Sequence, residues 1–243
     1  MSPSPEGGRP ERNRLLASLP RSEYDVLAPH IESLHVAVRH SLSVRGEPID
    51  YVHFPRGAVM SIVVDMEGGE MVEGATIGHE GIVGLAVYLG DGIGTETAFC
   101  QVPGMTARVR TADFRAAVDR SPALQCILRR YALALMGQMT RTAGCNRAHP
   151  LEERCARWLL MTRDRVGEDE FSLTHEFLAT MLGVRRATVT VAAGMLQQAG
   201  LIDYRRGHMR ILDRERLEAA ACEDYRLTNA IYDQLLPSAD GIG

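Results

Sequence analysis

Residues 173–212 constrain the fold of this chain more than any other stretch, because glycines divide them into two helical patterns and a hairpin. The first pattern begins at Thr174, a residue type that often caps helices. It ends at Gly183, where we expect a sharp turn with a positive φ. Apolar residues at helical spacing then continue to Leu196. Because Ala179 is small, the two helices can cross closely, so the pattern predicts a tightly packed helix pair.

A hairpin with an arginine-rich tip follows the second helix. Residues 201–204 and 209–212 have the character of short strands, and Arg205-Arg206-Gly207-His208 joins them. Between Arg185 and Arg210 there are five arginines and one acid, Asp203. Cations on the solvent side of a helix pair and at a hairpin tip favour contact with phosphate over a merely solvated surface. The segment therefore predicts a winged helix-turn-helix that contacts DNA.

Composition limits where such contacts can lie. The formal net charge of the 243 residues is -4, so any DNA contact must be local. No apolar stretch is long enough to span a bilayer, and the first ten residues have the character of a loose tail and not of a signal peptide. We therefore expect a cytoplasmic protein. The cysteines are odd in number and show no zinc or iron–sulfur spacing, so no metal site is expected; they are Cys100, Cys126, Cys145, Cys155 and Cys222.

Residues 34–110 have a different texture from the C-terminal part. Short runs rich in valine, isoleucine and aromatic residues, such as residues 59–64 and 97–102, alternate with glycine turns. Many short strands at near-regular spacing predict an antiparallel roll or barrel. Before them, residues 11–33 carry a short helical lead-in.

A long helix is expected after the roll. Ser121-Pro122 has the character of an N-cap followed by the first helical residue. One apolar face recurs at three- or four-residue steps and comprises Leu124, Leu128, Tyr131, Leu135 and Met139. Other apolar residues make the helix hydrophobic over more than one face. Packing within one chain explains one face, whereas pairing with a second copy explains the other, so we expect these five residues at a dimer interface.

These patterns predict an α+β fold with an N-terminal antiparallel β-roll of jelly-roll type, a long dimerisation helix and a C-terminal winged helix-turn-helix. The expected parts are a disordered tail at 1–14, a sensor roll at 15–120, the dimerisation helix and hinge at 121–148, the winged helix-turn-helix domain at 149–225 and a C-terminal tail at 226–243.

This organisation resembles the Crp/Fnr family of bacterial transcription regulators over roughly residues 15–225. The most specific matches are Leu173-Thr174, Ala179, Gly183-Val184 and Val189 at the family spacing, followed by Ala199-Gly200-Leu201-Ile202. The resemblance implies a homodimer that binds double-stranded DNA at an inverted repeat and contacts RNA polymerase. It also implies a cyclic-nucleotide-binding-like roll.

The resemblance also implies roles for single residues. Arg185, Arg186, Thr188 and Thr190 are implied to read bases, with Arg186 on guanine. His175 is implied to approach a backbone phosphate. The cluster of charge at the wing predicts further backbone contacts, which are Arg205, Arg206, His208 and Arg210. Ala187 and Val191 depart from the family, so the half-site should differ from the familiar consensus. Arg185 replaces the usual serine cap, which leaves that helix end poorly capped until a phosphate binds there.

The ligand signature of the cyclic-nucleotide-binding roll is missing. The family uses a glutamate and an arginine in a Gly-Glu-Leu…Arg-Ser/Thr-Ala pattern, whereas this chain has Gly84-Leu85-Ala86 and Glu96-Thr97-Ala98. Because Glu96 would repel a phosphate, we do not expect cyclic AMP to bind. No cofactor is expected, although an unknown small-molecule effector stays open. Haem at His53 or His79 is less expected, since a lone histidine in a roll is more often a packed or surface side chain.

Two other classes of function were weighed. A ligand-sensing or protein-interaction module that no longer reads DNA is the main alternative. An enzyme is not expected, because the sequence has no Gly-x-Ser-x-Gly motif, no phosphate-binding P-loop and no metal-spaced His/Glu pair. Gly90-Asp-Gly-Ile-Gly94 is better interpreted as a loop than as a dinucleotide fingerprint.

Overall fold

Two antiparallel sheets form the N-terminal half of the protein. The computed structural model describes residues 12–67 and 71–236. One sheet has the order β1 (Glu32–Val36), β7 (Gly104–Arg110) and β3 (Tyr51–Pro55). The other has the order β2 (Ser41–Ser43), β6 (Thr97–Val102), β4 (Val59–Asp65) and β5 (Met71–Ile77). Buried side chains from both sheets, including Phe54 and Met60, share one apolar core. The predicted roll is therefore confirmed.

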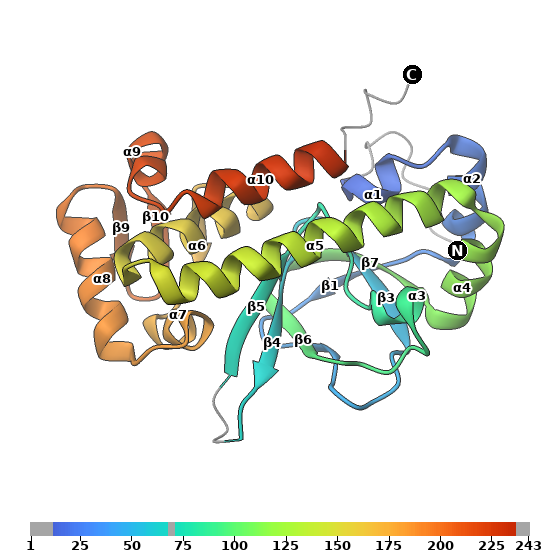
Figure 1. Cartoon of the computed structure of the whole chain (residues 1–243), viewed down its shortest axis with the longest axis horizontal. Helices are drawn as coiled ribbons and strands as arrows, with labels where there is room; N and C mark the ends of the chain where they lie inside the picture. Colours follow the sequence, from blue (N-terminus) through green and yellow to red (C-terminus); the bar gives the residue numbers. More distant parts are fainter. Residues whose placement is uncertain (1–11, 68–70, 237–243) are drawn as a thin grey trace, which may run out of the picture.

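Helix α5 (Pro122–Ala148) spans most of the molecule and joins the roll to the C-terminal part (Figure 1). Ser121 caps the helix by accepting a hydrogen bond from the backbone N–H of Leu124, and Pro122 is the first helical residue, as predicted. Short helices close the ends of the roll: α1 (Arg14–Ala17), α2 (Arg21–Leu27), the 3-10 helix η1 (Ala28–His30), α3 (Ala86–Leu89) and α4 (Thr111–Arg120).

The C-terminal part is a winged helix-turn-helix. It contains α6 (Leu151–Val166), α7 (His175–Leu182), α8 (Arg186–Gln198) and α9 (Arg214–Ala219). Its small sheet has the order β8 (Glu170–Ser172), β10 (His208–Ile211) and β9 (Ile202–Arg205). The strand β8 was not predicted, because residues 167–170 read as an acidic loop. Its alternation of Glu170, Phe171 and Ser172, exposed, buried and exposed, is the signal that was available.

The helix-turn-helix part packs directly on the roll of the same chain. Phe99 of β6 meets Phe177 of α7 edge to face, with ring centroids 6.1 Å apart. The Nε1–H of Trp158 donates to Glu73 Oε2 at 2.6 Å, and Arg165 contacts Glu80 at 2.8 Å. These polar contacts are buried, and each joins α6 to β5 or to the loop that follows β5.

Both predicted tails need correction where the structure describes them. Asn13 is fully buried, caps α1 and donates to the carbonyl oxygens of Pro55 and Gly81, so this residue packs with the roll and does not belong to a tail. Helix α10 (Asp224–Leu235) occupies most of the predicted C-terminal tail and lies alongside α5 (Figure 1). Tyr225, Thr228 and Tyr232 of this helix are buried at helical spacing, a pattern that the sequence prediction did not use. Residues 1–11 and 237–243 lie outside the described part of the chain.

Candidate nucleic-acid interface

The turn between α7 and α8 has the geometry that the sequence predicts. Thr174 caps α7 by accepting from the N–H of Phe177 at 3.1 Å. Gly183 ends the helix in the left-handed conformation, with a φ of 64°. Val184 then donates back to the carbonyl of Ala179 at 3.0 Å, which fixes the direction of the chain into α8. The small Ala179 is buried at the crossing of the two helices.

Helix α8 divides into a buried face and an exposed face. Val189, Ala192, Ala193 and Leu196 are buried against the rest of the domain. Arg185, Arg186, Ala187, Thr188 and Thr190 are exposed, and so is Val191. The structure therefore places all four predicted base-reading residues on the solvent side of the first turns of α8.

The N-terminus of α8 is uncapped. Arg185 occupies the N-cap position, and within the described chain no side chain accepts a hydrogen bond there. An uncapped helix start presents N–H groups and the positive end of the helix dipole to solvent. This confirms the poor cap predicted from the sequence, and two guanidinium groups lie directly beside it.

His175 connects α7, α8 and the wing. Its Nδ1 lies 3.1 Å from the hydroxyl of Thr190, which also donates to the Arg186 carbonyl at 3.0 Å. The imidazole stacks on Tyr204 of β9, with centroids 4.1 Å apart. Partial burial and the Arg186 guanidinium lower the pKa of His175, so the ring is neutral near pH 7. The structure thus brings His175 and Thr190 together, whereas the predicted roles treat them separately.

The wing turns through two residues with positive φ. Arg206 has a φ of 52° and Gly207 a φ of 83°, and Arg205 pairs with His208 across the turn. This is the geometry of a type I′ hairpin. Arg206 and His208 are exposed.

Two of the wing arginines have acidic neighbours. Arg205 lies 3.1 Å from Asp203, and Arg210 forms an ion pair with Glu170 of the unpredicted strand β8. Both ion pairs lie at the surface, where such a pair contributes little to stability. Each arginine can therefore readily exchange its acidic partner for another anion.

The predicted dimer residues do not lie together on an open face of α5. Leu124, Leu128, Tyr131 and Leu135 are buried against the roll of their own chain, and Tyr131 donates to the Ile82 carbonyl at 3.0 Å. Met139 is only partly buried. The prediction took the wrong face because both faces are apolar and a sequence pattern cannot say which one the roll covers.

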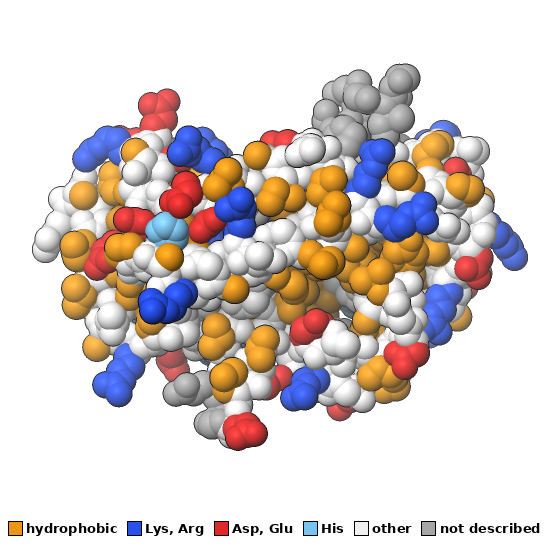
Figure 2. All heavy atoms as spheres, viewed as in Figure 1, with side chains coloured by type: hydrophobic (Ala, Val, Ile, Leu, Met, Phe, Trp, Pro, Cys, Tyr) orange, Lys and Arg blue, Asp and Glu red, His pale blue; other side chains and the backbone are white. Residues whose placement is uncertain are grey.

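The outward face of α5 carries large apolar side chains of its own. Leu133 is 56% exposed and Met136 is 64% exposed. Figure 2 shows hydrophobic side chains gathered along the middle of the molecule, over α5 and α10.

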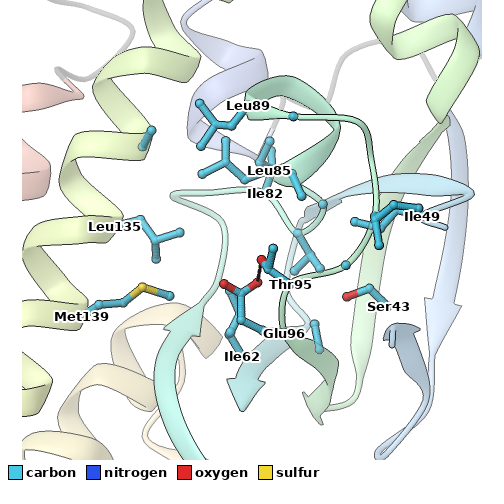
Figure 3. Close-up of a pocket in the computed structure, with 18 of the residues that line it drawn as sticks. Ser43, Ile49, Ile62, Ile82, Leu85, Leu89, Thr95, Glu96, Leu135 and Met139 are labelled. Carbon is cyan, nitrogen blue, oxygen red and sulfur yellow. Dashed lines mark hydrogen bonds between the residues drawn. The ribbon is translucent and has the colours of Figure 1, made fainter. Parts of the chain in front are cut away.

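A cavity of about 370 Å³ lies between the roll and α5. Figure 3 shows Leu135 and Met139 projecting into it from α5, opposite Ile49, Ile62 and Ile82 of the roll. The Glu96 carboxylate points into the same space and accepts from the Thr95 hydroxyl at 2.6 Å.

The charged side chains in the described lining of this cavity are all acidic. Its described lining includes the carboxylates of Asp91 and Glu96 and no arginine or histidine. The neighbouring chain Gly84-Leu85-Ala86 also lines it, so the two sequence segments without the nucleotide signature meet at this cavity.

His53, where haem was the less expected of two interpretations, is not among the residues that line this cavity. Burial, with Arg108 and His40 nearby, lowers its pKa to about 4. Among the described residues its Nδ1 has no hydrogen-bond partner. Within the described part of the chain, no helix is long and apolar enough to cross a membrane.

Comparison with known proteins gives one family match. Residues 153–220 match the Crp-like helix-turn-helix domain. This range begins in α6 and ends just after α9, so it contains α7, α8 and the wing. No curated protein matched the sequence.

Solved structures resemble most of this chain at low sequence identity. A transcriptional regulator of the Crp/Fnr family from Eubacterium rectale is 18% identical, with a TM-score of 0.65 over 85% of this chain and 96% of the other. FixK2 from Bradyrhizobium japonicum is 14% identical, with a TM-score of 0.65 over 79% and 98%. A CRP-family regulator from Thermus thermophilus is 18% identical, with a TM-score of 0.63 over 79% and 99%.

Proposed function

For a chain with the fold of the Crp/Fnr transcription regulators and a Crp-like helix-turn-helix domain at residues 153–220, we propose a homodimer that binds an inverted-repeat DNA operator. The observation that carries this proposal is the start of α8. There two arginines and an uncapped helix end face solvent on a rigid, well-packed element.

Base reading begins at Arg186. Its exposed guanidinium, one residue into α8, suits a bidentate contact with O6 and N7 of guanine in the major groove. Thr188 is exposed on the same turn, and Val191 offers an apolar surface for a thymine methyl group. Arg185 and the helix N-terminus receive the neighbouring phosphate.

His175 and Thr190 act as one unit in this proposal. Thr190 holds the Nδ1 side of the ring and stands beside the base-reading residues. Nε2 of His175 is buried and has no hydrogen-bond partner among the described residues, so the ring must first move to expose Nε2, with the ring proton on that atom, before it can donate to a phosphate. The backbone contact of His175 is thereby linked to the start of the recognition helix.

Phosphate contacts extend along the wing. Arg206 and His208 are exposed at the turn, and Arg205 and Arg210 exchange their surface acids for phosphate when DNA binds. With two copies related by a two-fold axis, the α8 helices read half-sites about 34 Å apart.

The dimer forms through the outward face of α5. Leu133 and Met136 are large and exposed, and a second copy of the same face would cover them. Contact with RNA polymerase stays a prediction that rests on the family resemblance.

We further infer that the roll cavity does not take cyclic AMP. Its acidic lining opposes a phosphate, while its apolar walls suit an uncharged or cationic molecule with an apolar body. Added cyclic AMP should leave the melting temperature unchanged. A clear rise would contradict this inference.

Selection of random DNA duplexes by the ligand-free protein tests the main proposal. We expect an enriched inverted repeat with half-sites one helical turn apart. Arg186→Ala should lose preference at one position of each half-site, at about 1–3 kcal/mol per contact. Arg120→Ala removes the same charge from the exposed end of α4 and serves as the control. No enrichment, with or without cell extract, would reject sequence-specific DNA reading.

A further inference from the structure

Two thiols that are far apart in the sequence meet where α5 ends and α10 begins. The Sγ atoms of Cys145 and Cys222 lie 3.3 Å apart, and both side chains are buried. Asp224, the first residue of α10, brings a carboxylate oxygen to the same place. The three donor atoms all lie within 4.8 Å of one another. Three side chains of metal-ligand type therefore converge on one buried point.

We propose that Cys145, Cys222 and Asp224 hold a zinc-type divalent cation. Zinc is bound in proteins by thiolate, imidazole and carboxylate ligands in tetrahedral geometry. With Zn–S bonds of about 2.3 Å, two sulfur ligands lie about 3.8 Å apart, so the thiols need to separate by only about 0.5 Å. His149 is a further donor in this region, with its Nε2 3.5 Å from Asp224 Oδ2.

The three donors would carry negative charge that suits a dication, although the guanidinium groups of Arg141, Arg154 and Arg157 also lie beside them. Two thiolates and one carboxylate carry three negative charges, and a divalent cation leaves one. Arg141 offsets that charge, since its Nη1 lies 2.9 Å from Asp224 Oδ1. Binding of a divalent cation releases the two thiol protons to solvent.

A redox-active cysteine pair is the competing interpretation of the same contact. A disulfide would use both sulfur atoms but would give Asp224 no role. The carboxylate is 6% exposed and pairs with Arg141 through Oδ1, and it also brings an oxygen to the two thiols, an arrangement that a disulfide would not use. The converging third donor therefore favours the metal site.

Such an ion would join the C-terminal end of α5 to the N-terminal end of α10. The sequence spacing hid this site, because Cys145 and Cys222 are 77 positions apart. The local signals were Cys145-x3-His149 and Cys222-x-Asp224, which acquire meaning only when α10 folds back on α5.

Cobalt titration of the full-length, reduced and chelator-treated protein tests the proposal. Co²⁺ reports thiolate ligands by charge-transfer absorption and tetrahedral geometry by intense visible bands. We expect one cobalt ion per chain, displaced by Zn²⁺, and a higher melting temperature with Zn²⁺. Cys145→Ser and Cys222→Ser should each weaken binding by at least about a hundredfold, more than loss of an outer-shell partner usually costs. Cys126→Ser, at the other end of α5, is the matched control.

The wild-type protein alone can overturn the proposal, whether or not the serine variants fold. Lack of cobalt–thiolate absorption at micromolar free Co²⁺ would contradict it, and so would equal binding by a folded Cys145→Ser variant. Mass analysis after peroxide treatment separates the competing interpretation. A Cys145–Cys222 disulfide in a protein that binds no metal would replace the metal site with a redox pair.

Discussion

At the scale of single residues, the helix-turn-helix depends on one backbone conformation that few residues other than glycine adopt readily. Gly183 has a φ of 64°, and a Cβ built there would lie 3.3 Å from both methyl groups of Val72. Gly183 therefore turns the chain from α7 into α8 and also lies against β5 of the roll. A residue with a side chain would be strained in its backbone and crowded by its neighbour.

Gly183→Ala should lower the free energy of unfolding by about 1 kcal/mol or more, because alanine is disfavoured at positive φ. Gly194→Ala is the matched control in the interior of α8, where a Cβ meets no atom of the described chain within 4 Å. It should stabilise the protein by about 0.5–1 kcal/mol, the difference in helix propensity. Urea unfolding midpoints measure both changes. Equal shifts of the same sign would contradict the assigned role of Gly183.

At the scale of secondary-structure elements, the wing has a position where a charge can be removed without changing the conformation of the turn. The turn needs positive φ at Arg206 and Gly207, yet only the first of these carries a charge. Asparagine tolerates the left-handed region better than most residues. Arg206→Asn therefore removes the cation while preserving the turn.

Arg206→Asn should flatten the plot of log binding constant against log salt by about 0.9 per lost phosphate contact, which is about 1.8 for a dimer. Base preference should not change, because a phosphate contact carries no sequence information. The binding constant of one selected operator at four salt concentrations provides the test. Arg120→Gln is the charge-matched control, and an unaltered slope for Arg206→Asn would remove Arg206 from the interface.

The limits of sequence-based prediction also appear at this scale. Elements with a strong local signal were predicted well: the cap at Thr174, the turn at Gly183 and the start of α5 at Ser121. What failed depends on contacts between distant segments. The face of α5 that the roll covers, the pairing of β8 with β10 and the return of α10 along α5 have no local signature.

The same limit applies to the candidate sites. The family resemblance gave Arg186 and Thr188 as candidates, and both are exposed on α8. The contact of His175 with Thr190 and Tyr204 required the fold. The meeting of Cys145 with Cys222 likewise required the folded arrangement of α5 and α10.

At the scale of the whole molecule, assembly depends on the exposed side of α5. Leu133→Asp places a carboxylate in the proposed contact between two copies, where it would lack a partner. We expect the dimer to dissociate at micromolar concentration in sedimentation velocity, with loss of operator binding. Val38→Asp changes an equally exposed apolar residue that follows β1 and should leave assembly intact. A fully dimeric Leu133→Asp protein would require another interface.

The packing of the two halves should respond to pH through Glu73. Burial raises the pKa of this carboxyl above its ordinary value, against hydrogen bonds from Ser61 and Trp158. The Ser61 hydroxyl lies 2.6 Å from Glu73 Oε1 and 2.8 Å from Gln101 Oε1, but it has one proton to donate. A protonated Glu73 can donate to Ser61 and leave the Ser61 proton for Gln101, which satisfies all three groups.

The sign of the pH effect follows from this raised pKa. The folded state retains a proton that the unfolded state releases near pH 4.3, roughly the ordinary glutamate pKa. Stability from this group is therefore complete below that pH and is lost as pH rises through the folded-state pKa.

Glu73→Gln imitates the protonated acid and should lack this loss. The melting temperature of the variant, relative to wild type, should increase between pH 5 and pH 8, whereas Glu47→Gln, an exposed control, should show a constant difference. A difference for Glu73→Gln that does not vary with pH would contradict a raised pKa.

The buried contacts of α6 also limit how this protein could exchange parts with its relatives. Trp158 and Arg165 belong to α6 in the C-terminal part. Trp158 donates a hydrogen bond to Glu73 of the roll, and Arg165 forms an ion pair with Glu80. A hybrid protein could join this roll to the helix-turn-helix domain of a relative that lacks both side chains. The carboxyl groups of Glu73 and Glu80 would then be buried with too few partners, and each would lower the free energy of unfolding by about 1–3 kcal/mol or more. Exchange of the whole C-terminal domain for that of a relative is therefore disfavoured. A stable hybrid must keep α6 together with the roll.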